Sequence, residues 1–136
     1  MSAQIFLSYS HNDTLLMQQV RDSLHTRGLK VWTDEDLEPG TPNWMIAIQH
    51  AIEESVAMIV IMTPDAASSI WVAREIGLAH DEGKPIFPLL AKGTKSEATP
   101  VKLILGAVQF IDIRTTAFST GIDSLVKVLV LQDLAW

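Results

Sequence analysis

An unbroken run of apolar residues, VAMIVIM at positions 56–62, lies near the middle of the chain. A membrane-spanning helix needs about 20 apolar residues, so this run is far too short to cross a bilayer. Extended by Thr63, it is typical of one continuous strand, and a strand without polar alternation belongs in a parallel sheet covered on both faces. The rest of the chain must therefore supply helices for two faces of one sheet.

Strand and helix patterns alternate on both sides of this run. Four further strands are predicted from short β-type runs, at residues 4–9, 29–33, 85–91 and 108–113. Such alternation predicts an α/β domain with a doubly wound parallel sheet of five strands and helices on both faces, because each right-handed crossover covers one face. We expect the flavodoxin-like strand order 2-1-3-4-5, with residues 1–136 forming a single domain.

The predicted helices have recognisable starts. Ser10 and Asp13 have the spacing of a capping box before the first helix. Thr41 and Pro42 are predicted to be the N-cap and the first residue of the second helix. Apolar residues recur at helical intervals along that second helix, at Met45, Ile48 and Ile52.

Composition excludes several classes of function. The formal net charge is −6 and no two Lys or Arg residues are adjacent, so we expect no nucleic-acid partner. The absence of cysteine excludes disulfides, thiolate metal sites and cysteine nucleophiles. The four histidines are scattered singly, and we interpret them as surface or capping residues, so no metal site is expected. Without a leader pattern or an apolar span, we expect a cytoplasmic protein with no membrane partner.

The expected fold locates a binding site before any chemistry is considered. In doubly wound sheets, ligands bind beyond the carboxyl ends of the strands, where the strand order reverses. With the order 2-1-3-4-5, this crevice is framed by the loops after the first and third strands.

The strongest candidate for chemistry follows the third strand, on a helix that Ser68 or Ser69 can cap. Trp71 and Glu75 are four residues apart and therefore share one side of this helix. Glu75 lies on the shoulder of the core stripe, where a carboxylate can border a cleft while an indole shields it from water. The alternative is an ordinary solvated glutamate beside a packing tryptophan. The core stripe consists of Val72, Ile76 and Ala79.

Three segments resemble conserved parts of Toll/interleukin-1 receptor (TIR) domains. Residues 5–13, IFLSYSHND, resemble the first box of the family, and residues 31–40, VWTDEDLEPG, resemble the second box, called the BB loop. The step from Trp71 to Glu75 is similar to the one that carries the catalytic glutamate in NAD-cleaving TIR proteins of bacteria, plants and animal axons. The resemblance runs in order over about residues 5–90.

This resemblance implies an enzyme that hydrolyses or cyclises NAD+ by cleaving the nicotinamide N-glycosidic bond, with Glu75 as the catalytic residue. NAD+ would be the substrate, and no cofactor is expected. Phe6, Ser8 and Trp71 would line the nicotinamide ribose pocket, and Asp34 would close over the ligand. Phe6 fits equally well as a core strand residue. The sequence leaves open hydrolysis versus cyclisation, the use of NADP and the activating signal.

The resemblance also implies partners. Enzymatic TIR domains act on oligomerisation, so we expect homotypic self-assembly in immune-type signalling such as antiviral defence. A sensor would be either a separate protein or a further part of the natural chain. The BB loop would cover the ligand or contact the next protomer; a solvated acidic turn is the simpler interpretation. The loop residues concerned are Asp36, Leu37, Glu38, Pro39 and Gly40.

Two alternatives differ in kind. One is a non-catalytic TIR adaptor or scaffold that acts through homotypic contacts. The other is a response-regulator receiver with Asp65 as phosphoacceptor and Lys92 after the fourth strand. The receiver fails because it needs an acidic pair after the first strand, where this chain has Tyr9, Ser10 and His11. Gly-rich phosphate loops and a GxSxG elbow are also absent.

Overall fold

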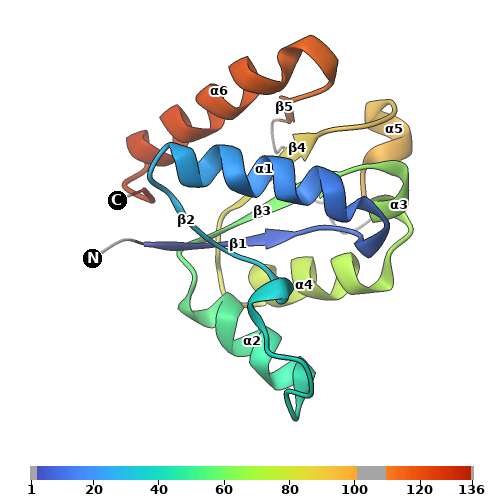
Figure 1. Cartoon of the computed structure of the whole chain (residues 1–136), viewed down its shortest axis with the longest axis vertical. Coiled ribbons are helices and arrows are strands. Elements are labelled where there is room, and N and C mark those ends of the chain that lie inside the picture. The colour runs from blue at the N-terminus through green and yellow to red at the C-terminus, as the bar shows by residue number, and fades with distance from the viewer. Residues whose placement is uncertain (1–2, 101–109, 136) are drawn as a thin grey trace.

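The computed structural model describes residues 3–100 and 110–135, and its centre is a parallel sheet (Figure 1). The five strands follow the order β2-β1-β3-β4-β5, which confirms the predicted topology. Residues 108 and 109 of the predicted fifth strand lie outside the described residues. The strands are β1 Gln4–Ser8, β2 Lys30–Trp32, β3 Ala57–Met62, β4 Ile86–Leu90 and β5 Ile111–Asp112.

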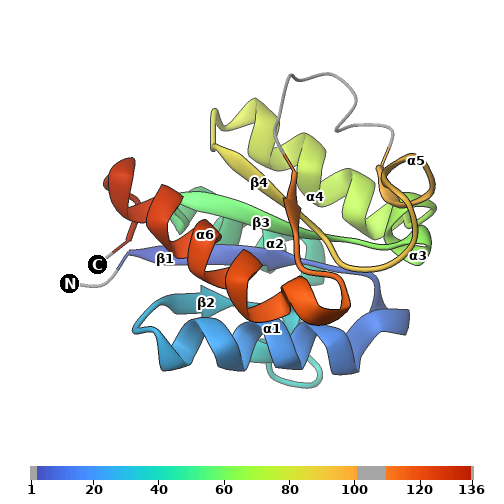
Figure 2. The same cartoon turned by 90° about the horizontal axis from the view of Figure 1, so that it is seen from above.

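Helices cover both faces of this sheet (Figure 2). One face carries α1 and α6, and the other carries α2 and α4. None of the described helices is long and apolar enough to span a membrane. The helices are α1 Thr14–Thr26, α2 Trp44–Glu54, α3 Pro64–Ala67, α4 Ile70–Asp81, α5 Lys95–Ala98 and α6 Phe118–Leu131. Short 3₁₀ turns are η1 His11–Asp13, η2 Asp34–Asp36 and η4 Thr115–Ala117.

The strand β3 confirms the interpretation of the apolar run. All six of its residues are buried. Side chains alternate across the sheet: Ile59 and Ile61 pack into the core under α1 and α6, whereas Met58 and Val60 pack into the core under α2 and α4. Because both faces are covered, neither set of positions can be polar.

The capping box predicted at Ser10 and Asp13 is right for Ser10 but wrong for Asp13. Ser10 does cap η1, since its hydroxyl accepts from the backbone N–H of Asn12 at 3.3 Å. The buried Asp13 carboxylate instead accepts from the Thr63 hydroxyl at 2.5 Å and pairs with Lys92 Nζ at 3.4 Å. A carboxylate buried at this depth needs partners, and the ends of β3 and β4 supply them. Asp13 thereby anchors the loop that follows β1.

Replacing Asp13 by alanine is expected to lower the free energy of unfolding by about 2 kcal/mol, because a buried hydrogen-bonded carboxylate is lost and the buried Thr63 hydroxyl loses its acceptor. Urea unfolding of the variant beside the wild type measures this difference. The matched control is the exposed Asp22, whose replacement by alanine should change stability by less than about 1 kcal/mol. Equal effects of the two replacements would contradict the anchoring role.

The predicted start of the second helix is also wrong. The helix α2 begins at Trp44, and its N-cap is Asn43 in the left-handed conformation, with φ of 54°. The Thr41 hydroxyl donates to the carbonyl of Glu38 instead. The first turn of α2 reaches beyond the sheet (Figure 1), and Met45 in that turn is exposed.

Candidate active site

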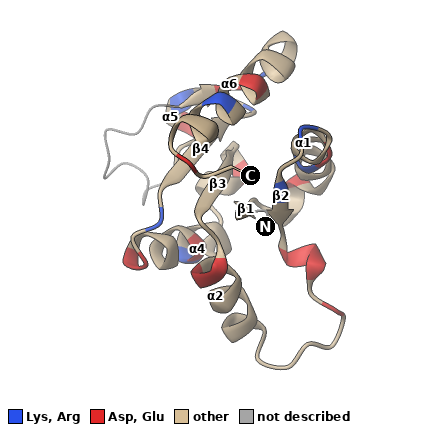
Figure 3. Cartoon of the chain, turned by 90° about the vertical axis from the view of Figure 1, so that its left-hand side faces the viewer, with Lys and Arg blue, Asp and Glu red and all other residues tan. Residues whose placement is uncertain are grey.

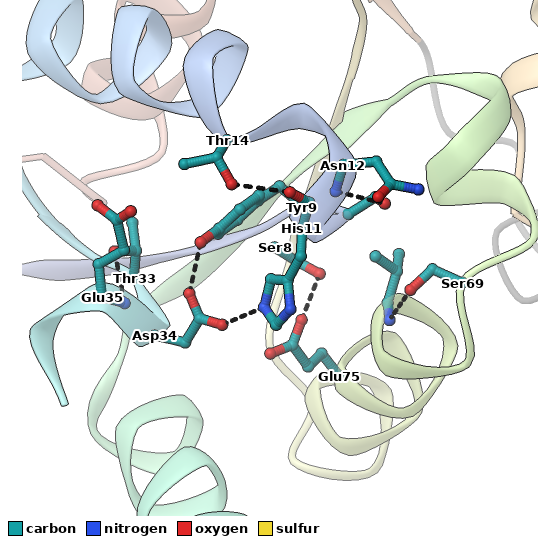
Figure 4. Close-up of polar contacts among 12 residues, drawn as sticks. Ser8, Tyr9, His11, Asn12, Thr14, Thr33, Asp34, Glu35, Ser69 and Glu75 are labelled. Carbon is teal, nitrogen blue, oxygen red and sulfur yellow. Dashed lines mark hydrogen bonds and ion pairs between the residues drawn. The ribbon is translucent and has the colours of Figure 1, made fainter. Parts of the chain in front are cut away.

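The candidate site lies where β1 ends, between the turn after β2 and the helix α4 (Figure 4). Ser8 is the last residue of β1, and Asp34 begins the turn η2 that follows β2. Glu75 comes from the second turn of α4, whose start is fixed by Ser69: its hydroxyl accepts from the Val72 N–H at 3.2 Å, confirming the predicted cap. The topology therefore brings side chains from three distant segments to one place.

Glu75 is more deeply buried than its shoulder position on the helix suggests. Only 7% of the residue is exposed. The fully buried Ser8 hydroxyl donates to Glu75 Oε1 at 2.7 Å. A glutamate held in this way is pre-positioned, because the strand that carries its partner is part of the rigid sheet.

Burial also changes the protonation of this carboxyl group. Removal from water raises the pKa of Glu75 from its ordinary 4.5 to about 8. The hydrogen bond from Ser8 acts in the opposite direction, and the negative charge of Asp34 adds to the increase. A carboxyl group with this pKa is mainly protonated at neutral pH. Strongly shifted acids of this kind concentrate at functional sites.

Asp34 is the second carboxylate of the site and is held by two aromatic side chains. The Tyr9 hydroxyl donates to Asp34 Oδ1 at 2.6 Å, and His11 Nε2 is paired with Asp34 Oδ2 (Figure 4). Burial and the proximity of Asp34 raise the pKa of Tyr9, so this phenol remains a donor. His11 is thus not an isolated surface residue, and nothing in its sequence spacing indicated a contact with a residue 23 positions away.

Trp71 borders an open polar pocket. Its side chain is 37% exposed, contacts the edge of Trp44 at 6.5 Å between ring centroids, and lies under the Arg74 guanidinium at 5.8 Å. The pocket, of about 260 Å³, has a mainly polar lining that includes Ser10, His11, Asn12, Ser69 and Trp71. The indole is available to a ligand that enters from this side.

Phe6 lies in the core. It is 1% exposed, and its ring stacks on Trp32 at 5.2 Å between centroids. This position matches the simpler of the two interpretations of Phe6, and its contact with a ribose stays a prediction.

The BB-loop segment begins as an ordered acidic turn (Figure 3). Asp36 closes a capping box, because its carboxylate accepts from the Thr33 N–H at 2.9 Å. Leu37 is half-buried against the core under α2 and α4. Glu38, Pro39 and Gly40 are exposed. The loop is thus anchored at Leu37 and free to contact a ligand or protein beyond it.

Comparisons with known proteins agree with this architecture. The model of the TIR domain family matches residues 5–126. No curated protein matches the chain. Among solved structures, the TIR domains of the activated Roq1 resistosome, which recognises the pathogen effector XopQ, superpose with a TM-score of 0.71 at 21% identity, covering 94% of this chain and 99% of that one.

Two further structures share the fold. A TIR-STING receptor from C. gigas, solved with 2',3'-cGAMP, has a TM-score of 0.69 at 24% identity and covers 89% of this chain but 38% of that one. The CMP N-glycosidase BcmB of Clostridium botulinum has a TM-score of 0.59 at 20% identity, and the match covers 94% of this chain and 98% of that one. At these identities the likeness is one of fold. Because the family model extends over nine-tenths of the sequence and the strand order agrees with it, the chain belongs to the TIR domain family.

Proposed function

We propose that this TIR domain cleaves the nicotinamide N-glycosidic bond of NAD+, with Glu75 as the catalytic residue. One observation carries the proposal: a buried carboxyl group, held by Ser8 and close to a second carboxylate, lies at the switch point of the sheet. Nicotinamide leaves a pyridinium as a neutral molecule, so its departure needs no general acid. A single carboxylate that stabilises the positive charge developing on the ribose is sufficient.

The protonation of Glu75 suits this chemistry. An approaching cation favours the ionised form of a nearby carboxyl group. The pyridinium ribose would therefore convert Glu75 to the carboxylate at the moment when its negative charge is needed. Ser8 would keep that carboxylate oriented, Asp34 would add a second negative charge, and Trp71 would border the entering ligand. Attack by water then gives ADP-ribose, and attack by the substrate's own base gives a cyclic isomer.

A second candidate function uses Glu75 in its protonated form. The CMP N-glycosidase with this fold acts, by its name, on a nucleoside monophosphate. Departure of a neutral pyrimidine is helped by a proton, and Glu75, with its pKa of about 8, carries one at neutral pH. This alternative keeps Glu75 as the central residue but makes it an acid.

The experiment that tests the proposal offers NAD+ and CMP separately to the purified protein, in dilute and in crowded buffer, and separates the free bases by chromatography. We expect nicotinamide to be released, and released faster under crowding. Release of cytosine alone would favour the N-glycosidase. No free base from either substrate would overturn the catalytic proposal and favour the adaptor or scaffold.

The cellular setting that we propose follows the family. Self-assembly would activate the domain, a separate sensor protein would trigger that assembly, and the reaction would serve immune-type signalling in the cytoplasm. The exposed residues Glu38 to Gly40 of the BB loop are available for such homotypic contacts.

Asp34 offers a test of the electrostatics. Replacing Asp34 by asparagine removes a negative charge that raises the pKa of Glu75. The midpoint of the pH profile for nicotinamide release is therefore expected to move to lower pH, and kcat/KM is expected to fall by about tenfold as a ligand contact is weakened. Steady-state kinetics across pH measures both effects. A midpoint that moves to higher pH would contradict this arrangement.

A further inference from the structure

A groove between α2 and α4 lies on the surface of the α2/α4 layer, away from the sheet. It has a volume of about 420 Å³, and its lining includes Met45, Ile70, Arg74, Gly77, Leu78 and Asp81. Ile70 is 71% exposed, and Met45 is also exposed. Large apolar side chains gathered in this way are typical of contact surfaces.

The exposed face of α4 has a specific order of side chains. At 3.6 residues per turn, positions 70, 74, 77 and 81 share one side of the helix, opposite the core stripe of Val72, Ile76 and Ala79. Arg74 and Asp81 are two turns apart, about 10 Å along the axis. Between them lies Gly77, where an added Cβ would meet no atom within 4 Å. The backbone is open to close approach at this point.

The two charges on this face are not satisfied by ion pairs within the described part of the chain. No carboxylate there pairs with Arg74, whose guanidinium lies over the Trp71 ring, and no cation pairs with Asp81. The positively charged Arg74 and the negatively charged Asp81 thus lie on either side of Gly77, along an apolar groove.

We propose that a second copy of this chain covers the groove, with the two α4 helices packed antiparallel about a two-fold axis near Gly77. A two-fold contact requires a surface that is complementary to itself. The order Arg74, Gly77, Asp81 meets this requirement, because reversal of the helix places Arg74 against Asp81 of the partner subunit and the same pair forms again across the axis. Gly77 allows the helices to approach closely, and Ile70 and Met45 are covered at the same time.

This contact is separate from the BB loop and does not depend on the proposed function. Its consequence for activity does rest on that proposal: the same helix carries Glu75 on its buried side, so association would fix the helix that positions the carboxyl group. Self-association is expected to be weak, because the charges lie at the edge of a modest groove.

The test is sedimentation velocity of the full chain over a wide concentration range. The wild type is expected to form dimers. Arg74→Glu and Asp81→Arg should each weaken dimerisation at least tenfold, since each places like charges together twice. An equimolar mixture of the two single variants should dimerise again, and so should the double variant. Lys127→Glu, an equal charge change on the exposed side of α6, should leave dimerisation unchanged.

A further variant tests the close approach independently of charge. Gly77→Leu fills space that is empty in the single chain and improves helix propensity, so it should fold but fail to dimerise. A wild type that stays monomeric at every concentration would overturn the proposal, as would dimers that persist in the single charge variants. Folded variants whose mixture does not recover dimerisation would also overturn it. Since the readout is hydrodynamic, failure here is distinguishable from failure to cleave NAD+.

Discussion

A Glu75→Gln variant is expected to release nicotinamide from NAD+ with a kcat/KM lower by roughly a thousandfold, the scale on which loss of a pre-positioned electrostatic group acts. Glutamine has the same shape and can still accept the hydrogen bond from Ser8. It cannot carry the negative charge that the ribose cation requires. Steady-state kinetics in crowded buffer measures the loss.

The matched control for this experiment is Glu82→Gln. Glu82 is exposed at the C-terminal end of the same helix, so this variant should keep the activity of the wild type. Full activity in Glu75→Gln, or equal losses in the two variants, would remove Glu75 from the catalytic role while leaving the fold assignment untouched.

The same substitution is expected to stabilise the protein at alkaline pH. The folded-state pKa of Glu75, about 8, lies above its ordinary value of 4.5. Between these values the native state binds more protons than the unfolded state, so wild-type stability declines as pH rises from about 4.5 through about 8. Glutamine does not titrate. The stability of Glu75→Gln relative to the wild type should therefore grow across this interval, by at most about 5 kcal/mol.

Urea unfolding of the two proteins at several pH values measures this effect without any substrate. Glu82→Gln again serves as the control, because it makes the same chemical change at an exposed position of the same helix. A stability difference that is constant from acid to alkaline pH would show that Glu75 titrates like a solvated glutamate. The catalytic and thermodynamic predictions thus test two consequences of one buried carboxyl group.

The framework of the fold could be predicted because its signals are local. The run at 56–62 has no polar position, which is typical of a strand covered on both faces, and β3 is that strand. The recurrence of Val72, Ile76 and Ala79 likewise defines the buried stripe of α4. Periodicity is set by helix and strand geometry, so a single chain segment is enough to reveal it.

The connections of the site could not be predicted in the same way. His11 and Asp34, and Asp13 and Thr63, are joined by contacts across 23 and 50 positions of the sequence. A capping-box spacing predicted a local role for Asp13, but tertiary partners at the ends of β3 and β4 take its carboxylate. Short-range patterns do not contain this information, because it depends on how the strands are ordered in the sheet.

For Glu75, one property could be predicted from the sequence and another could not. Helical spacing placed it on the shoulder of the core stripe and made it a candidate. Its near-complete burial depends on the end of β1, where Ser8 meets it at 2.7 Å. Met45 likewise has helical spacing with Ile48 and Ile52, but it is exposed because the first turn of α2 extends past the sheet.

The pH dependence of nicotinamide release by the wild-type protein tests the central claim most directly. The logarithm of kcat/KM reports the ionisation of the free enzyme. If the ionised Glu75 side chain cleaves NAD+, kcat/KM should rise about tenfold per pH unit in the acid range and level off above a midpoint near 8. A rate that falls through the same midpoint, or no nicotinamide at any pH, would contradict it.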